Sequence, residues 1–454
     1  MVREKAKEKN MQEPVRVTVV VPTFNAGDTT RGVEIARAIQ RVADQRGREV
    51  EVSFLHPETR QSFVKQIAEA GYETRSTGLA LSQEEVDTIM RADHDGTEFL
   101  TDQRRSGDVI DAITDDLRQY RPDLMVYGFI PHAGIAAQLM GIPSVVYSPC
   151  PVYRPWLEQY FLLDVPDDLR LRIVDRLPKR LRTWMARRLS SLAMRSGFFR
   201  QPVLARAARE RGWDNPQTDM FGMLDADIQL VNDLPIYYEG QDVGPRTRIA
   251  GPLFSKPVDV PVPPEIVHRF AGEGAPKVFV AMGSSGEKEY LLTAIEAVAG
   301  VNCRAVVVCP PHVVSLDEAR LRLGEIDHVL LTDRFVPAPA VNSLADVAII
   351  HGGQGTVQTA VYAGTPVLGT GMQWEQCSNL DRLVQRGSAI RIPRKNWQVS
   401  RVRESLERLI ADPAHAVAAR ELQEELASTD GYQMTGDLIW DLLSEISRGD
   451  EPDM

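Results

Sequence analysis

The feature that most constrains this chain is an apolar run that ends in a glycine-rich turn. Val347–Ile350 predicts a buried strand, the next six residues read HGGQGT, and a helical pattern follows. Glycines let a ligand approach the backbone closely, and the unpaired N–H groups of a first helical turn attract anions. The pattern therefore predicts an anion-binding corner, to which His351 and Thr356 add side-chain donors.

Two further polar residues follow the next apolar run, Pro366–Leu368. Glu375 and Gln376 come shortly after this run in the sequence. If phosphates occupy the glycine-rich turn, these side chains are placed to reach hydroxyl groups on the same ligand. The ligand that this pattern favours therefore carries both phosphates and hydroxyls.

Apolar strand-like runs alternate with helical patterns in both halves of the chain. The first half has strand-like runs at residues 15–21, 50–55, 124–127, 144–147 and 226–232; the second has them at 277–282, 304–309, 329–331 and 347–350. This alternation predicts an α/β protein with mostly parallel, doubly wound, Rossmann-like sheets. Two such halves imply a ligand cleft between them.

A proline-rich stretch separates the halves and sets the predicted domain boundaries. The stretch around residues 256–264 reads as an extended linker. We predict an N-terminal domain at residues 1–240, with a frayed tail at 1–14 and an insert at about 151–222. The linker is predicted at 241–264 and the C-terminal domain at 265–454.

Composition excludes several functional classes. The chain has 454 residues, 43% hydrophobic and 25% charged, which is typical of a soluble globular protein, and its net charge of −11 argues against nucleic acid as a partner. We see no apolar run long enough to span a membrane and no secretory signal. The four cysteines show no metal-binding spacing, so a reducing cytoplasm and no metal are expected.

Six short motifs follow one another between residues 334 and 379. They are Arg334-Phe335-Val336-Pro337, His351-Gly352-Gly353, Gly355-Thr356, Gly364-Thr365-Pro366, Glu375-Gln376 and Asn379. The segment that contains them resembles the donor-binding signature of the GT-B nucleotide-sugar glycosyltransferases, in the superfamily of the UDP-glycosyltransferases and bacterial antibiotic glycosyltransferases. The resemblance implies that the C-terminal domain binds a UDP- or dTDP-sugar as co-substrate, that the N-terminal domain binds the acceptor, and that no further cofactor is needed.

The resemblance also implies roles for single residues of the donor site. Phe335 and Val336 would flank the nucleobase, and Glu375 and Gln376 would bind sugar hydroxyls. The diphosphate would be held on one side by Ser284 and Ser285 and on the other by His351, Gly353, Gly355 and Thr356.

The chain departs from the family pattern at the catalytic base. The family carries a histidine in the first N-terminal loop, oriented by an aspartate, but here Asp28 aligns with the histidine and Tyr127-Gly128 stands where the aspartate is expected. Three interpretations follow. Asp28 is itself the base, or His132 takes over this role from a neighbouring loop. In the third interpretation, the acceptor needs little activation or the protein is not catalytic.

The predicted insert combines aromatic and basic residues. Tyr153 and Trp156 begin an aromatic cluster that suggests an acceptor with an apolar body. Three interpretations of the basic stretch stay open: helices covering the acceptor site, contact with an anionic or lipid-like acceptor or a membrane surface, and contact with a protein. The basic residues are Arg170, Arg172, Arg176, Lys179, Arg180, Arg182, Arg187, Arg188 and Arg195.

These observations favour an inverting, metal-independent glycosyltransferase that acts on a small-molecule natural product, as in antibiotic biosynthesis. Inversion is implied by the resemblance alone. Two alternatives stay open: a nucleotide-sugar epimerase of the same fold, and a catalytically inert binding or partner protein that keeps the donor pocket.

Overall fold

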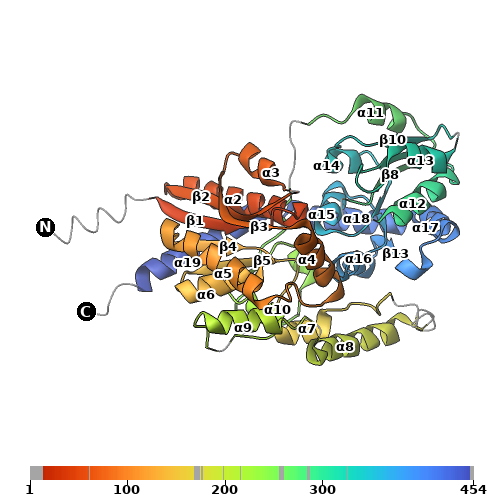
Figure 1. Cartoon of the computed structure of the whole chain (residues 1–454). Helices are drawn as coiled ribbons and strands as arrows, with labels where there is room; N and C mark the ends of the chain where they lie inside the picture. Colours follow the sequence, from red (N-terminus) through yellow and green to blue (C-terminus); the bar gives the residue numbers. More distant parts are fainter. Residues whose placement is uncertain are drawn as a thin grey trace. The chain divides into compact units, whose positions relative to one another are not determined.

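Valine-rich runs form two separate parallel sheets in the computed structural model (Figure 1). The structure describes residues 14–60, 62–167, 174, 177–197, 199–214, 216–254, 260–283, 287–324 and 326–449. The described residues group into two units. Unit 1 comprises those within 1–158, 191–253 and 430–454, and unit 2 those within 159–190 and 254–429.

Unit 1 contains a seven-stranded sheet in the order β3-β2-β1-β4-β5-β6-β7. All neighbours are parallel, with Val20 of β1 opposite Tyr127 of β4. The order reverses between β1 and β4, which is where ligands bind in open α/β sheets. The strands are β1 (Val15–Val20), β2 (Val50–Thr59), β3 (Glu73–Leu81), β4 (Leu124–Tyr127), β5 (Ser144–Ser148), β6 (Ile228–Val231) and β7 (Thr247–Ile249).

Local capping signals fix the helices of unit 1. The Asn25 side chain accepts from the backbone N–H groups of Gly27 and Asp28 at the start of α2, and Gly47 ends this helix with a left-handed φ of 60°. The elements are α2 (Ala26–Arg46), α3 (Val64–Glu69), α4 (Gln83–Asp95), α5 (Gln103–Tyr120), α6 (Pro131–Met140), α9 (Pro202–Glu210), α10 (Met220–Met223), η3 (Pro235–Tyr237) and α19 (Gly431–Gly449).

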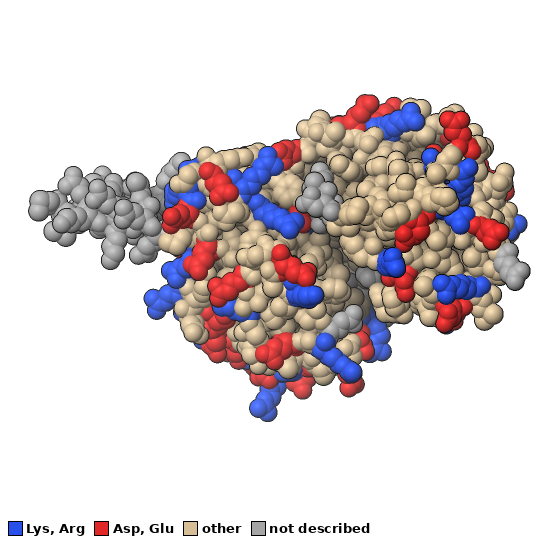
Figure 2. Space-filling view, turned by 90° about the horizontal axis from the view of Figure 1, so that it is seen from above, with Lys and Arg blue, Asp and Glu red and all other residues tan. Residues whose placement is uncertain are grey.

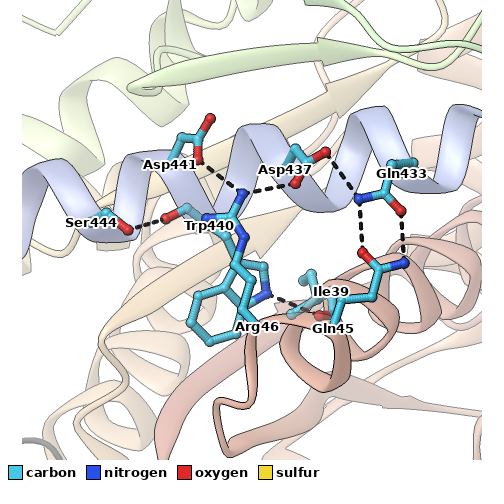
Figure 3. A network of polar contacts seen from close by, with 8 residues as sticks. All are labelled: Ile39, Gln45, Arg46, Gln433, Asp437, Trp440, Asp441 and Ser444. Atoms are coloured by element: carbon cyan, nitrogen blue, oxygen red, sulfur yellow. Dashed lines mark hydrogen bonds and ion pairs between the residues drawn. The ribbon is translucent and has the colours of Figure 1, made fainter.

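The last helix, α19, packs against α2 and so belongs to unit 1 (Figure 3). Trp440 is 3% exposed and its Nε1 donates to the carbonyl oxygen of Ile39 at 3.0 Å. Arg46 of α2 donates to Asp437 at 2.7 Å and to Asp441 at 3.0 Å. A buried anchor with an ionic rim therefore joins the C-terminal helix to the N-terminal sheet.

Unit 2 contains a six-stranded parallel sheet in the order β10-β9-β8-β11-β12-β13. The order reverses between β8 and β11, where Ala281 lies opposite Ile350. The core on one face of this sheet includes Val280, Ile295 and Leu406. The strands are β8 (Lys277–Ala281), β9 (Arg304–Val308), β10 (Val329–Thr332), β11 (Val347–Ile350), β12 (Val367–Gly369) and β13 (Ala389–Arg391).

Helices alternate with these strands, as a doubly wound sheet requires. The predicted α/β fold with two doubly wound sheets is therefore confirmed. The helices of unit 2 are α11 (Pro264–Phe270), α12 (Lys288–Ala299), α13 (Leu316–Leu323), α14 (Ala338–Asn342), α15 (Gln354–Ala363), α16 (Trp374–Arg386), η4 (Arg394–Asn396), α17 (Val399–Ala411) and α18 (Pro413–Ala427).

The two units do not follow the predicted boundaries. The described residues within 430–454 were predicted in the C-terminal domain but group with unit 1, and the described residues of the insert within 159–190 group with unit 2. The predicted linker at 241–264 contains β7, which pairs with β6 as the edge strand of unit 1. Within the predicted insert, α7 (Arg154–Tyr160) and α8 (Lys179–Ser196) come before α9 and α10. Arg170, Arg172 and Arg176 lie outside the described residues.

Charged side chains are mixed over the face drawn in Figure 2, where lysines and arginines lie among aspartates and glutamates. No described helix is both long and apolar enough to cross a bilayer.

Candidate functional site

The strongest candidate site in unit 2 lies where β8 and β11 end side by side. Gly283 follows β8 and His351 follows β11 directly. A Cβ atom placed on Gly283 would lie 2.2 Å from Cε1 of His351, so the imidazole rests against this glycine. The predicted anion corner thus coincides with the strand-order reversal at which doubly wound sheets bind ligands.

The glycine-rich turn presents the N-terminus of α15. Gly352 has a left-handed φ of 87°, and a Cβ there would lie 2.5 Å from the carbonyl oxygen of Gln376, so only glycine fits. A Cβ on Gly355 would meet nothing within 4 Å. The helix therefore starts with its first N–H groups and positive dipole end beside open space, as an anion site requires.

The hydroxyl of Thr356 is committed to this turn. It donates to the carbonyl oxygen of Gly353 at 2.7 Å. Thr356 thus offers a ligand its backbone N–H, while its hydroxyl proton is used to close the first turn. Gly353 also lies close to His351, since a Cβ on Gly353 would be 2.5 Å from Nε2 of the imidazole.

His351 is a buried polar group with one ring nitrogen that no described residue satisfies. The residue is 5% exposed, and its Nδ1 has no hydrogen-bond partner among the described residues. Burial lowers its pKa to about 4, so the imidazole is neutral near pH 7 and carries one donor nitrogen and one acceptor nitrogen. Orphaned buried polar atoms are rare in folded proteins, and one at this position points to a ligand.

Asn379 connects the glycine-rich turn to Glu375. Its Nδ2 donates to the carbonyl oxygen of Gly352 at 3.0 Å and to Oε1 of Glu375 at 2.6 Å. Asn379 is 5% exposed, whereas Glu375 in the first turn of α16 is only partly buried. Asn379 therefore links the Glu375 carboxylate, which is predicted to bind sugar hydroxyls, to the glycine-rich turn, which is predicted to bind phosphates.

Gln376 occupies a different position from its neighbour. It is 2% exposed; its Oε1 accepts from the backbone N–H of Met372 at 2.8 Å, and its Nε2 donates to Oε1 of Gln373 at 2.9 Å. The same Oε1 accepts from the backbone N–H of Gln373 at 3.3 Å, and the Gln373 side chain accepts from the backbone N–H of Gln376, so the two residues close the start of α16 as a capping box. The sugar-binding role of Gln376 stays a prediction, and in this structure the amide supports the helix that carries Glu375.

Of the two residues predicted to flank the nucleobase, one lies at the surface and the other in the core. Phe335 is 76% exposed, whereas Val336 is 8% exposed and packs with Ile266, Phe270 and Val341. An exposed aromatic ring is available for stacking on a flat heterocycle. Ser284 and Ser285, predicted to contact the phosphates, lie outside the described residues.

The sequence did not predict a buried ionic triad that includes Asp381 of α16. Arg391, at the end of β13, pairs with Asp381 at 2.6 Å and with Asp167 at 3.0 Å. Asp167 also accepts from the backbone N–H of Arg394 at 3.0 Å. Burial, partly offset by Arg391, raises the pKa of Asp381 to about 6. The triad fixes residue 167 of the insert to the strand beside α16.

An aromatic contact joins the same segment to the first residue of α16. The rings of Phe161 and Trp374 have centroids 4.7 Å apart, and Phe161 is 6% exposed. Trp374 precedes Glu375 directly. Residues 161–167 are therefore part of the packing that holds the start of α16.

In unit 1, Asp28 lies in the first turn of α2, after β1. The hydroxyl of Tyr147 donates to its backbone oxygen at 3.1 Å. The residue is partly buried, and burial, opposed by Arg31, raises the pKa of its carboxyl to about 6. A carboxylate with such a pKa is mostly ionised near neutral pH and is basic enough to accept a proton, as the predicted role requires.

His132 lies at the start of α6, after β4, the strand next to β1. It is 6% exposed, its Nε2 has no hydrogen-bond partner in the described part of the chain, and burial lowers its pKa to about 4. Asp28 and His132 thus follow adjacent strands at the reversal point of the first sheet. Both stay candidates for the base.

The predicted acceptor-binding aromatics differ in exposure. Trp156 is 2% exposed, and its Nε1 donates to Oε1 of Gln241 at 2.8 Å, which places it in the core of unit 1. Tyr153 lines a surface pocket of about 220 Å³ together with Gln229 and Arg246. Acceptor contact stays a prediction for both, and only Tyr153 lines that pocket.

Within the described residues, no group of three or more His, Cys, Asp or Glu side chains is arranged to hold a metal ion.

Comparison with known proteins shows what this chain is similar to. Residues 307–434 match the family "Erythromycin biosynthesis protein CIII-like, C-terminal domain", and this range contains β11, α15 and α16. Among curated proteins, UDP-glycosyltransferase 2 of Phaeomoniella chlamydospora is 29% identical over 170 residues, 37% of either chain. The 4'-demethylrebeccamycin synthase of Lentzea aerocolonigenes is 26% identical over 220 residues, 47% of this chain and 49% of that protein. The chain spans about half or less of the length of these relatives.

Solved structures agree over nearly the whole chain. Spinosyn forosaminyltransferase SpnP has a TM-score of 0.64 at 16% identity and covers 95% of this chain and 100% of its own. Glycosyltransferase VinC, in complex with DTDP, has a TM-score of 0.62 at 18% identity and covers 96% and 100%. The protein has the GT-B fold. The resemblance predicted from the motifs is confirmed as a similarity: residues 307–434 match the family model, and the relatives and solved structures that resemble the chain are glycosyltransferases.

Proposed function

We propose that this protein is a glycosyltransferase that moves a sugar from a UDP- or dTDP-linked donor to a small-molecule natural product. One observation carries the proposal. The buried His351, whose Nδ1 has no partner among the described residues, and the N-terminus of α15 meet at the strand-order reversal of unit 2, inside the segment that matches the family model. A diphosphate supplies the acceptor oxygens that both features require.

The donor would bind through three parts of unit 2. The diphosphate lies at the N–H groups of Gly355 and Thr356, with a donor nitrogen of His351 beside them. The nucleobase stacks on the exposed ring of Phe335, and Glu375, held by Asn379, accepts from sugar hydroxyls. This distribution gives each part of the donor a group of matching chemistry.

The chemical step would be an in-line displacement at the anomeric carbon. The acceptor nucleophile forms its bond as the bond to the diphosphate oxygen breaks, which inverts the configuration. Negative charge grows on the leaving diphosphate, and the fixed dipole of α15 and the neutral His351 stabilise it without reorganisation. In this proposal no metal ion takes part.

Asp28 would remove the proton from the acceptor. Its carboxyl has a pKa of about 6, closer to neutral pH than that of His132 at about 4, and proton transfer is most efficient when these values match. His132 is the alternative base, because its unpartnered Nε2 follows the neighbouring strand.

The proposal is tested by release of nucleoside diphosphate. The protein is incubated with UDP- and dTDP-sugars, with and without a panel of hydroxylated aromatic and polyketide acceptors, in the presence of a chelator. We expect diphosphate release that depends on the acceptor and is insensitive to the chelator. His351→Ala should lower turnover by roughly 100-fold, whereas exposed His268→Ala in the same unit should not.

Calorimetric titration with the donor separates the alternatives. Donor binding without diphosphate release across the panel would favour an inert binding protein. Conversion of the donor to an isomeric nucleotide sugar without acceptor would favour an epimerase. No donor binding at all, or an unaffected His351→Ala variant, contradicts the assignment of this corner.

A further inference from the structure

Helix α8 (Lys179–Ser196) has a charge opposite to that of the chain. The chain carries a net charge of −11, but α8 contains one lysine, five arginines and no acidic residue. Two of the arginines pair with acids on neighbouring segments, Arg182 with Asp164 at 3.2 Å and Arg195 with Glu158 at 2.9 Å. The other basic residues, Lys179, Arg180, Arg187 and Arg188, form no ion pair with a described acid.

The same helix exposes large apolar side chains on the side away from its buried face. Leu181 is 42% exposed, Trp184 55% and Leu192 62%. The buried side consists of Ala186, Ser190 and Met194. At 100° per residue, positions 181, 184, 188 and 192 fall on one face of a helix, opposite the buried residues.

An arginine lies within this apolar stripe. The guanidinium carbon of Arg188 is 5.6 Å from the centre of the Trp184 ring, and Arg187 lies similarly over Tyr160 at 5.5 Å. An arginine stacked on an aromatic ring keeps its charge beside the apolar surface instead of away from it. Arg188 and the apolar groups therefore belong to one surface, and Arg187 lies on its flank next to Trp184. We call this surface with its flank the α8 face, defined by Leu181, Trp184, Arg187, Arg188 and Leu192.

We propose that the α8 face docks on the surface of an anionic lipid bilayer, with α8 lying in the plane of the membrane interface. A strongly cationic helix with tryptophan and leucine on one side is the type that inserts its apolar side between headgroups and pairs its charges with anionic lipids. The inference does not depend on the proposed function, since no residue of the donor or base site takes part.

Charge complementarity favours a bilayer over an acidic protein. The apolar side chains project from a single helix, and the cations without an ion pair lie on and beside them. A bilayer provides both an apolar interior and a continuous anionic layer at once, whereas a protein would have to offer a matching apolar groove with acids along its edge.

The experiment is sedimentation of the full chain with large unilamellar vesicles. One set contains phosphatidylcholine alone and the other about 30 mol% phosphatidylglycerol, at about 0.15 M and about 0.5 M salt. We expect the protein to sediment with the anionic vesicles at low salt, to be released at high salt, and to stay in solution with neutral vesicles. The protein without vesicles measures self-association and must stay in the supernatant.

Two variants on exposed positions locate the contact. Arg187→Gln with Arg188→Gln should weaken partitioning roughly 30-fold, and Trp184→Ser should weaken it roughly tenfold or more. The matched control is Leu321→Ser, since Leu321 is 86% exposed on α13, away from this helix in the sequence. All variants should keep the wild-type circular dichroism spectrum, because the side chains are at the surface.

Three results would overturn the proposal: no sedimentation with anionic vesicles, equal sedimentation with neutral ones, or binding that both α8 variants retain. A protein that ignores vesicles but co-sediments with an acidic polypeptide would assign the α8 face to a protein partner instead.

Discussion

Gly283 and His351 lie in direct contact at the ends of neighbouring strands: a Cβ on Gly283 would be 2.2 Å from Cε1 of the imidazole. Gly283 also has a left-handed φ of 68°. The strand end is thus built so that the histidine ring fills the space a side chain would take. The orientation of the His351 ring therefore depends on a glycine 68 positions earlier in the sequence (351 − 283).

Gly283→Ala should displace the imidazole. We expect at least a tenfold loss of donor affinity by calorimetry and a loss of roughly 1–3 kcal/mol in the free energy of unfolding. Gly47→Ala is the matched control, because Gly47 also has a left-handed φ, 60°, but nothing lies within 4 Å of its Cβ position. Equal donor affinity in both variants would show that the ring contact does not matter.

Phe335→Ala should act on affinity alone. The ring is 76% exposed, so its removal should change the free energy of unfolding by less than about 0.5 kcal/mol. Loss of stacking on the nucleobase should weaken donor binding roughly threefold to tenfold. The measurement is titration with free UDP and dTDP, and unchanged affinity for both would remove Phe335 from the donor site.

The sequence was sufficient where local patterns decide the structure. The apolar run 347–350 and the following glycines predict a strand, a turn and a helix start, and the structure places them at residues 347–350, 351–353 and from 354. Repeated strand and helix patterns likewise predict two parallel sheets, because each period is set by local geometry. These are features that neighbouring residues specify among themselves.

Features that depend on distant partners were not predictable. Nothing near Asp167 indicates that it pairs with Arg391, 224 residues away, and the capping role of Gln376 depends on how residues 372–373 turn. Glycines and prolines in 241–264 suggested a linker, although β7 forms there by pairing with β6. The assignment of α19 to unit 1 depends on contacts with α2 that no periodicity reveals.

Because Arg391 belongs to the buried triad, its substitution should strongly lower the free energy of unfolding. Arg391→Met would leave Asp381 and Asp167 buried without a counter-charge, at a cost of about 3–5 kcal/mol in the free energy of unfolding. Because burial already raises the pKa of Asp381 to about 6, loss of the guanidinium should raise it further, so the variant should be less destabilised near pH 5 than near pH 8. Urea unfolding at both pH values measures this.

Arg401→Met is the control for the triad. Arg401 is 52% exposed and pairs with Glu404 on the same helix, so its loss should cost less than about 0.5 kcal/mol at either pH. An Arg391→Met variant as stable as this control would mean that the buried carboxylates are neutral in the wild type.

Substitution of Trp440 tests whether α19 stabilises unit 1. Trp440→Ala removes a 3% exposed ring and its bond to the carbonyl of Ile39, and should cost about 3–5 kcal/mol in urea unfolding. Val417→Ala, on the 52% exposed Val417 of α18, is the control and should change stability by less than about 0.5 kcal/mol. Similar stabilities would contradict the grouping of α19 with unit 1.

Asp28→Asn should have opposite effects on stability and on activity. Burial raises the pKa of Asp28 from 3.8 to about 6, so between these values the folded protein binds more protons than the unfolded chain. The contribution of Asp28 to the free energy of unfolding of the wild type therefore decreases as the pH rises through that window. The destabilisation by the ionised carboxyl is complete above about pH 6. Asparagine removes it: the variant should be more stable than wild type by roughly 2–3 kcal/mol near pH 8 and similar near pH 4.

Turnover should follow the ionised form of the same carboxyl. If Asp28 is the base, the wild-type rate rises with pH to a plateau with a midpoint near 6, and Asp28→Asn loses roughly 100-fold to 1,000-fold. Acceptor-independent hydrolysis of the donor serves as the control, since it reports donor binding without the base. His132→Gln should leave the midpoint unchanged. Loss of turnover in His132→Gln with retention in Asp28→Asn would assign the base to His132, because a gain in stability without a loss of rate leaves the buried carboxylate no chemical role.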